Sequence, residues 1–112
     1  MGRVKATRAG RRPGTPSMPD RRRIARLCAR WKVRELSLFG SVAAGRSTAR
    51  SDVDLLVTFR PRSGWNLLDF VRLKEELEEL FGRPVDLVDE GALANPFRRK
   101  SILEARKVLY AG

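Results

Sequence analysis

The chain of 112 residues lacks the features that mark membrane proteins and disulfide-stabilised proteins. No apolar run approaches the roughly 18 residues that a membrane-spanning helix needs. No apolar segment follows the basic N-terminus, which argues against a secretory signal. Cysteine occurs once, as Cys28 among apolar helix positions, so a disulfide framework is excluded and a small buried side chain is expected. We therefore expect a cytoplasmic protein that does not enter a membrane.

Positive charge is unevenly distributed along the chain. The formal net charge is +11, from 24 Lys and Arg against 13 Asp and Glu. Residues 1–34 hold 12 of the basic residues and a single acid, Asp20, whereas residues 35–112 hold 12 residues of each sign. The basic character therefore belongs to the N-terminal third. Within it, Arg22, Arg26 and Arg30 are spaced to share one face of a helix, which is interpreted either as a solvated surface or as a surface that contacts phosphates or an acidic partner.

The composition divides the chain into a tail and one domain. Residues 1–18 mix Arg, Gly, Pro and Ser without an apolar period, and they predict a disordered basic tail. Met18 offers an alternative start, so residues 1–17 could lie outside the natural protein. Residues 19–112 fit a single domain, because domains commonly contain about 100 to 150 residues. The hydrophobic fraction of 42% favours a folded core.

Helical and strand patterns alternate through the domain. Apolar residues at i, i+3, i+4 and i+7 predict a helix over 19–33, with Asp20 as its N-cap. Asn66 and Gly82 are the expected cap and stop of a longer helix. A closing helix is expected over 98–110. Its inward residues would be Ile102, Ala105, Val108 and Leu109. Strands are expected over 34–39, 53–59 and 84–88. This alternation predicts an α/β (α+β) fold with a small mixed sheet and flanking helices.

Three aspartates occupy strand positions that are unfavourable for a carboxylate. Asp52 and Asp54 are two residues apart at the head of a strand, so their side chains leave the same face of the sheet. Asp86 lies inside the apolar strand Val85–Val88. Carboxylates that lie close together resist joint ionisation, and bound divalent cations such as Mg²⁺ remove the conflict. A lone Asp-x-Asp is weak evidence, because turn-flanking aspartates are common. Asp52 could be an ordinary loop residue and Asp86 an ordinary strand-edge residue.

The dipeptide Gly40-Ser41 strengthens the metal hypothesis. It precedes Asp52 by ten intervening residues, at the expected end of the first strand. If a helix begins at Ser41, the glycine lets a phosphate approach the backbone and the free N–H groups attract anions. The serine hydroxyl adds a further donor. Together these residues favour a triphosphate cradle beside a two-metal site.

The combined motif resembles a known family signature. Gly40-Ser41, ten intervening residues, Asp52-x-Asp54 and Asp86 on a later strand resemble the signature of the DNA polymerase beta superfamily of nucleotidyltransferases. Within that superfamily the segment from Ile24 to Tyr110 is similar to the minimal, or MNT-type, nucleotidyltransferase domain. The resemblance implies a polymerase-beta-type fold and an enzyme that transfers a nucleotide from a nucleoside triphosphate.

The resemblance also implies roles for individual residues. A hydroxyl would attack the α-phosphorus of ATP in line, with pyrophosphate leaving and two Mg²⁺ ions stabilising the entering and departing oxygens. The third carboxylate of the family completes the metal site and helps to activate the hydroxyl. Carried over, the catalytic and metal-binding residues are Asp52, Asp54 and Asp86, and the nucleotide-binding residues are Gly40, Ser41 and Arg46.

One position departs from the family pattern. MNT-type domains commonly carry Arg shortly after Gly-Ser, where this chain has Ala44. Arg46 or Arg50 could replace it as a contact to the triphosphate, and ordinary solvation of the loop is the alternative. The departure raises the prospect of weakened catalysis or an altered choice of nucleotide.

The same resemblance points to a protein partner. MNT-type domains of this size resemble the antitoxin of prokaryotic modules whose toxin is a HEPN-domain ribonuclease, which implies transfer of AMP to a tyrosine hydroxyl of the toxin. One alternative is an antitoxin that neutralises its partner by contact, with little or no catalysis. Another is nucleotidyl transfer to RNA, or RNA binding through the basic N-terminus, although no aromatic residues interleave there for base stacking.

Overall fold

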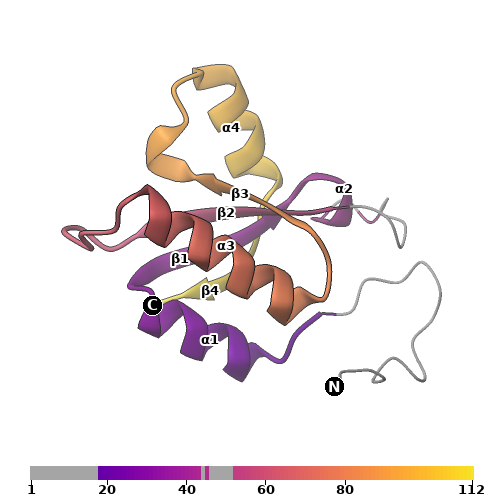
Figure 1. Cartoon of the computed structure of the whole chain (residues 1–112). Coiled ribbons are helices and arrows are strands. Elements are labelled where there is room, and N and C mark those ends of the chain that lie inside the picture. The colour runs from indigo at the N-terminus through magenta and orange to yellow at the C-terminus, as the bar shows by residue number, and fades with distance from the viewer. Residues whose placement is uncertain (1–17, 44, 46–51) are drawn as a thin grey trace.

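The structure, a computed structural model, describes residues 18–43, 45 and 52–112 (Figure 1). A four-stranded sheet has the strand order β3-β2-β1-β4. Helices α1 (Arg21–Arg30) and α3 (Leu67–Phe81) cover one face, and α4 (Pro96–Ala105) covers the other (Figure 1). The remaining elements are β1 (Val33–Phe39), α2 (Gly40–Ala43), β2 (Val53–Phe59), β3 (Val85–Asp89), the 3₁₀ turn η1 (Glu90–Ala92) and β4 (Lys107–Ala111). Within the described ranges, none of the helices has the length and apolarity to span a bilayer.

Pairing directions make the sheet mixed. β1 is antiparallel to β2 and to β4, whereas β2 is parallel to β3. The parallel pair needs a crossover connection, which α3 provides. The mixed sheet with flanking helices confirms the predicted α/β fold class. The predicted tail, apart from Met18, lies outside the described residues.

Apolar side chains fill both sides of the sheet. The larger cluster lies under α1 and α3 and includes the fully buried Leu77. Cys28 belongs to this cluster, and burial raises the pKa of its thiol to about 12. The expectation of a buried cysteine is confirmed. The smaller cluster joins Ile102 of α4 to Phe39 and Leu56 of the sheet.

Local sequence sets the helix ends. The side chain of Asp20 accepts a hydrogen bond from the backbone N–H of Arg22 at 2.9 Å and caps α1. Asn66 and Asp69 exchange side-chain and backbone hydrogen bonds in a capping box at the start of α3. Gly82 ends α3 in the left-handed conformation, with φ 68°. All three predicted cap and stop residues are confirmed.

The first predicted helix is too long at its C-terminal end. It was expected over 19–33, but α1 ends at Arg30 and Val33 already belongs to β1. Lys32, with φ 55°, turns the chain between them. The strand predicted over 34–39 therefore begins one residue earlier, the strand predicted over 84–88 is shifted to Val85–Asp89, and β2 has its predicted bounds.

The predicted closing helix over 98–110 is wrong in its second half. The helix ends at Ala105, and Lys107–Ala111 forms β4 instead, antiparallel to β1. Arg106 between them has extended dihedral angles, φ −70° and ψ 150°. A short apolar run fits the periodicity of a helix as well as that of a strand. The β-branched and aromatic residues of this segment favour a strand, which pairs with the otherwise free edge of β1.

The inward residues of that segment change accordingly. Ile102 is buried as predicted, with 7% of its surface exposed. Leu109 is half-buried against the larger cluster. Ala105 and Val108 are exposed, so their predicted burial is wrong. The helix spacing that placed them inward does not extend past Ala105.

Candidate active site

The candidate site centres on Asp54, the second residue of β2. In the parallel pairing, Asp54 stands directly opposite Asp86 of β3, so both side chains leave the same face of the sheet. Asp52 immediately precedes β2. Leu56 follows Asp54 by two residues and packs against Ile102, so the acidic face is the one that α4 covers. The structure thus brings together the three aspartates singled out in the sequence.

Electrostatics link the three carboxylates. The pKa of Asp54 is raised, first by burial and then by the negative charges of Asp86 and Asp52. The positive charge of Arg98 on α4 acts in the opposite direction. Asp54 is half-buried, whereas Asp52 and Asp86 are exposed, so the site opens to solvent.

The residues present suit a cation that is shared with a phosphate-bearing substrate. Among the described residues, no three acidic, His or Cys side chains are close enough to enclose a metal ion by themselves. The negative charges of Asp86 and Asp52 nevertheless contribute to the raised pKa of Asp54, and a divalent cation would offset this repulsion. Mg²⁺ typically takes one or two carboxylates and completes its shell with water and phosphate oxygens. An open carboxylate group on two adjacent strands meets that requirement.

Gly40, the first residue of α2 directly after β1, borders the site. Its φ is 75°, a conformation that side chains disfavour. A Cβ at this position would overlap Oδ2 of Asp54 and would lie 2.9 Å from its Cγ. Two features therefore require glycine at this position: the positive φ of the backbone and the closeness of the Asp54 carboxylate. The short helix begins at Gly40, one residue before the expected Ser41.

Several predicted contacts lie outside what the structure describes. These are the side chain of Ser41 and the whole of Ala44, Arg46 and Arg50. Arg46 and the Ser41 hydroxyl remain predicted nucleotide contacts.

Glu78 of α3 holds the start of β3, a role that sequence reasoning missed. Its carboxylate accepts a hydrogen bond from the backbone N–H of Val85 at 3.0 Å and another from Nζ of Lys74 at 3.0 Å. Val85 directly precedes Asp86. In addition, the backbone N–H of Val53 donates to the carbonyl oxygen of Pro84 at 2.9 Å. These bonds join α3 and the first residue of β2 to the start of the strand that carries Asp86.

Glu78 predicts a pH-dependent contribution to stability. Its pKa is lowered, first by the hydrogen bond from Val85 and then by Lys74. A lowered folded-state pKa means that the folded chain binds fewer protons than the unfolded chain. The stabilisation is therefore present above the unfolded value of 4.5 and is lost as the pH falls through the folded pKa. We expect Glu78→Gln to flatten the acid-side fall in the free energy of unfolding, measured by urea titration at a series of pH values.

Glu79→Gln is the matched control for this measurement. Glu79 is the exposed neighbour on the same helix and has no hydrogen-bond or ion-pair partner within the described part of the chain. The control should keep the wild-type dependence of the free energy of unfolding on pH. Identical slopes for wild type and Glu78→Gln below pH 4.5 would contradict the prediction.

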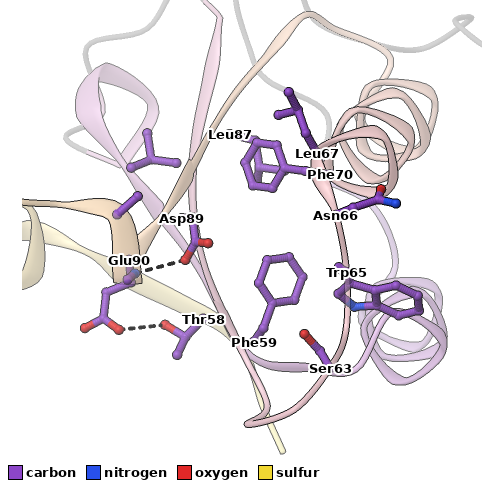
Figure 2. Close-up of a pocket in the computed structure, with 13 residues that line it drawn as sticks. Thr58, Phe59, Ser63, Trp65, Asn66, Leu67, Phe70, Leu87, Asp89 and Glu90 are labelled. Carbon is purple, nitrogen blue, oxygen red and sulfur yellow. Dashed lines mark hydrogen bonds between the residues drawn. The ribbon is translucent and has the colours of Figure 1, made fainter.

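A large open groove lies at the opposite end of β2 and β3 (Figure 2). Its volume is about 890 Å³, and Phe59, Trp65 and Phe70 contribute aromatic rings to its lining. Asp89 and Glu90 line another part of it, but both carboxylates already accept hydrogen bonds, from η1 and α4 respectively. None of the predicted site residues whose side chains the structure describes lines this groove. The candidate site is therefore identified by its carboxylates and not by the size of a cavity.

Comparison with known families decides the class of the protein. The family model of the nucleotidyltransferase domain matches residues 21–109. The chain belongs to this family. The predicted recognition and enzyme class are thereby confirmed: the chain is a nucleotidyltransferase, and the four-stranded sheet with the aspartates at the starts of β2 and β3 is its nucleotidyltransferase domain.

Named relatives of this nucleotidyltransferase are adenylyltransferases. The protein adenylyltransferase MntA of Thermococcus cleftensis is 42% identical over 81 residues, which cover 72% of this chain and 77% of that protein. A Methanocaldococcus jannaschii protein, named as a candidate protein adenylyltransferase, is 41% identical over 75 residues, covering 67% of this chain and 74% of that protein.

Solved structures agree with the fold. A structure described as a candidate minimal nucleotidyltransferase is 44% identical, with a TM-score of 0.66, and the match covers 78% of this chain and 86% of that one. A Shewanella oneidensis complex of a tri-AMPylated HEPN toxin with its MNT antitoxin matches at 21% identity and a TM-score of 0.60, covering 82% of this chain and 70% of that one. A toxin–antitoxin structure with AMP-PNP matches at 23% identity and a TM-score of 0.68, covering 83% of this chain and 74% of that one. The last two show likeness of fold alone.

Proposed function

We propose that this nucleotidyltransferase transfers AMP from ATP to a tyrosine hydroxyl of a HEPN-domain toxin and thereby acts as its antitoxin. The observation that carries the proposal is the pairing of Asp54 with Asp86, beside a glycine whose missing side chain makes room for the Asp54 carboxylate. Relatives at 41% and 42% identity that are named adenylyltransferases support AMP as the transferred group. The AMPylated HEPN toxin seen with an MNT antitoxin of similar fold supports the class of acceptor.

The reaction needs little from the protein beyond charge and position. Asp52, Asp54 and Asp86 would hold two Mg²⁺ ions together with phosphate oxygens of ATP. Bound divalent cations supply charge stabilisation to the entering and departing oxygens. The absence of a side chain at Gly40 leaves room for the carboxylate of Asp54 at its observed position. Ser41 and Arg46 are proposed as further phosphate contacts.

Asp86 is suited to take the proton of the acceptor. Its carboxylate is exposed, whereas that of Asp54 is half-buried, so an incoming hydroxyl can reach it. The acceptor oxygen forms a bond to the α-phosphorus, the bond from that phosphorus to the bridging oxygen breaks, and pyrophosphate leaves. The hydroxyl proton passes to a carboxylate oxygen of Asp86. Because that side chain faces solvent, it can then release the proton to water.

The test is transfer to the natural partner. The purified chain is incubated with ATP, MgCl₂ and the protein encoded by the neighbouring reading frame, and intact mass spectrometry follows the partner. We expect the partner to gain the mass of one or more AMP groups, to gain none with EDTA, and to gain less when its acceptor tyrosine is replaced with Phe. An unmodified partner in the presence of ATP and Mg²⁺ would contradict the proposal.

A further inference from the structure

We infer that Arg98 of α4 binds a phosphate of the nucleotide held at the aspartates, so that α4 supplies a positive charge to the site. This inference rests on the proposed function, because it assigns a contact within the same site. It adds a residue that lies far from the Gly-Ser and Asp-x-Asp motifs in the sequence.

Packing places α4 beside Asp54. Ile102 is buried against Phe39 of β1 and Leu56 of β2. Phe39 is the register partner of Asp54, and Leu56 lies two residues after Asp54 on the same face of the sheet. The two residues that Ile102 packs against are therefore near neighbours of Asp54, one on β1 and one on β2.

Helix geometry directs Arg98 toward that position. Arg98 precedes Ile102 by four residues, about one turn, and so shares its side of the helix. Asn95 fixes this turn, since its side chain accepts hydrogen bonds from the backbone N–H groups of Phe97 at 2.9 Å and Arg98 at 3.2 Å. The charge of Arg98 reaches Asp54, because it lowers the pKa that burial and the neighbouring aspartates raise.

Arg98 is available, whereas other arginines of this region are engaged. Arg99 donates to Glu90 at 2.7 Å, and Arg106 lies 3.0 Å from a carboxylate oxygen of Glu35. The guanidinium of Arg98 is exposed and forms no hydrogen bond or ion pair with any residue that the structure describes. A guanidinium that lies within electrostatic reach of the Asp54 carboxylate without pairing with it has its donors free for a ligand.

The chemistry of the donor favours a phosphate. A guanidinium presents a planar fork of N–H donors that matches two oxygens of a phosphate, and such charge-assisted pairs are stronger than neutral hydrogen bonds. A nucleotide bound at the carboxylates brings further negative charge to an acidic site. Arg98 on α4 offsets part of that charge, as it already does for Asp54.

The test measures binding of a non-hydrolysable ATP analogue in Mg²⁺ by calorimetry, with the full chain and three variants. Arg98→Ala should weaken binding by about tenfold or more, since it removes a charge-assisted hydrogen-bond donor. Arg98→Lys keeps the charge without the fork and should fall between wild type and Arg98→Ala. Lys100→Ala is the matched control, because it removes one positive charge from the outward groove beside Phe97 and Glu104 and should bind as wild type.

The outcomes separate this inference from the proposed function. Equal affinity for wild type and Arg98→Ala, or equal weakening by Arg98→Ala and Lys100→Ala, overturns the role of Arg98 and leaves the proposed function standing. A wild-type chain that does not bind the analogue in Mg²⁺ overturns both. Unchanged thermal unfolding of the Arg98 variants excludes a loss of fold as the cause of weaker binding.

Discussion

Replacing Asp52 and Asp54 together with Asn should reduce AMP transfer by about 1,000-fold or more while leaving the fold intact or more stable. Under the proposed function transfer is lost because neutral amides would no longer hold the divalent cations. Stability is kept because Asn matches Asp in shape. The pKa of Asp54 is raised by burial and by its two acidic neighbours, so ionisation of Asp54 is less favourable in the folded chain than in the unfolded chain. A less active chain with an equal or higher melting temperature is the expected result.

Intact mass spectrometry of the partner and thermal unfolding of the enzyme measure the two effects. Glu79→Gln is the control, because it removes one negative charge from an exposed position on α3, on the other face of the sheet from the aspartates. It should leave transfer unchanged. Transfer by the double variant within about tenfold of wild type would contradict the assignment of both aspartates.

The same double variant separates catalysis from contact. If the chain neutralises its partner by transferring AMP, cells that produce the partner should lose protection when both carboxylates are replaced. If binding alone suffices, protection should survive, although no AMP is found on the partner. The intact fold of the double variant makes this comparison meaningful, since a folded surface remains available for contact.

Local patterns explain which elements could be predicted from sequence. β2 has its predicted bounds because an apolar run ends at a turn-rich segment, and α3 ends at Gly82 because glycine adopts the left-handed cap. β4 could not be predicted, because five residues fit a helix or a strand and only the free edge of β1 decides between them.

Some features of the candidate site could likewise be predicted from local sequence, whereas others could not. The two-residue spacing of Asp52 and Asp54 predicts that they share a face. That Asp86 stands opposite Asp54 follows from parallel pairing of two strands separated by α3, which no local pattern specifies. Glu78 and Arg98 were missed as contributors because each acts across the fold from a helix, where a charged residue has the appearance of ordinary solvated surface.

Gly40→Ala is expected to lower both the stability of the fold and the rate of AMP transfer. The same substitution at a second glycine separates the effect of backbone strain from that of overlap with Asp54. Alanine at φ 75° costs about 1 kcal/mol of stability by backbone strain. Its Cβ would also overlap the carboxylate of Asp54, which would have to move. We expect an unfolding free energy lower by more than this strain alone and transfer reduced by about 100-fold, since small displacements of catalytic groups have effects of that size.

Gly64→Ala is the matched control for Gly40→Ala. Gly64 has φ 77°, and a Cβ there would meet nothing within 4 Å, so alanine at this position introduces the strain without the overlap. It should lose about 1 kcal/mol and keep wild-type transfer. Combining Gly40→Ala with Asp54→Ala removes the overlap with Oδ2 and Cγ and leaves only the Asp54 Cβ, at 3.2 Å, so the double change should destabilise less than the sum of the single changes. Additive effects in urea unfolding, or equal loss of transfer in the Gly40 and Gly64 variants, would show that Gly40 does not hold the Asp54 carboxylate in place.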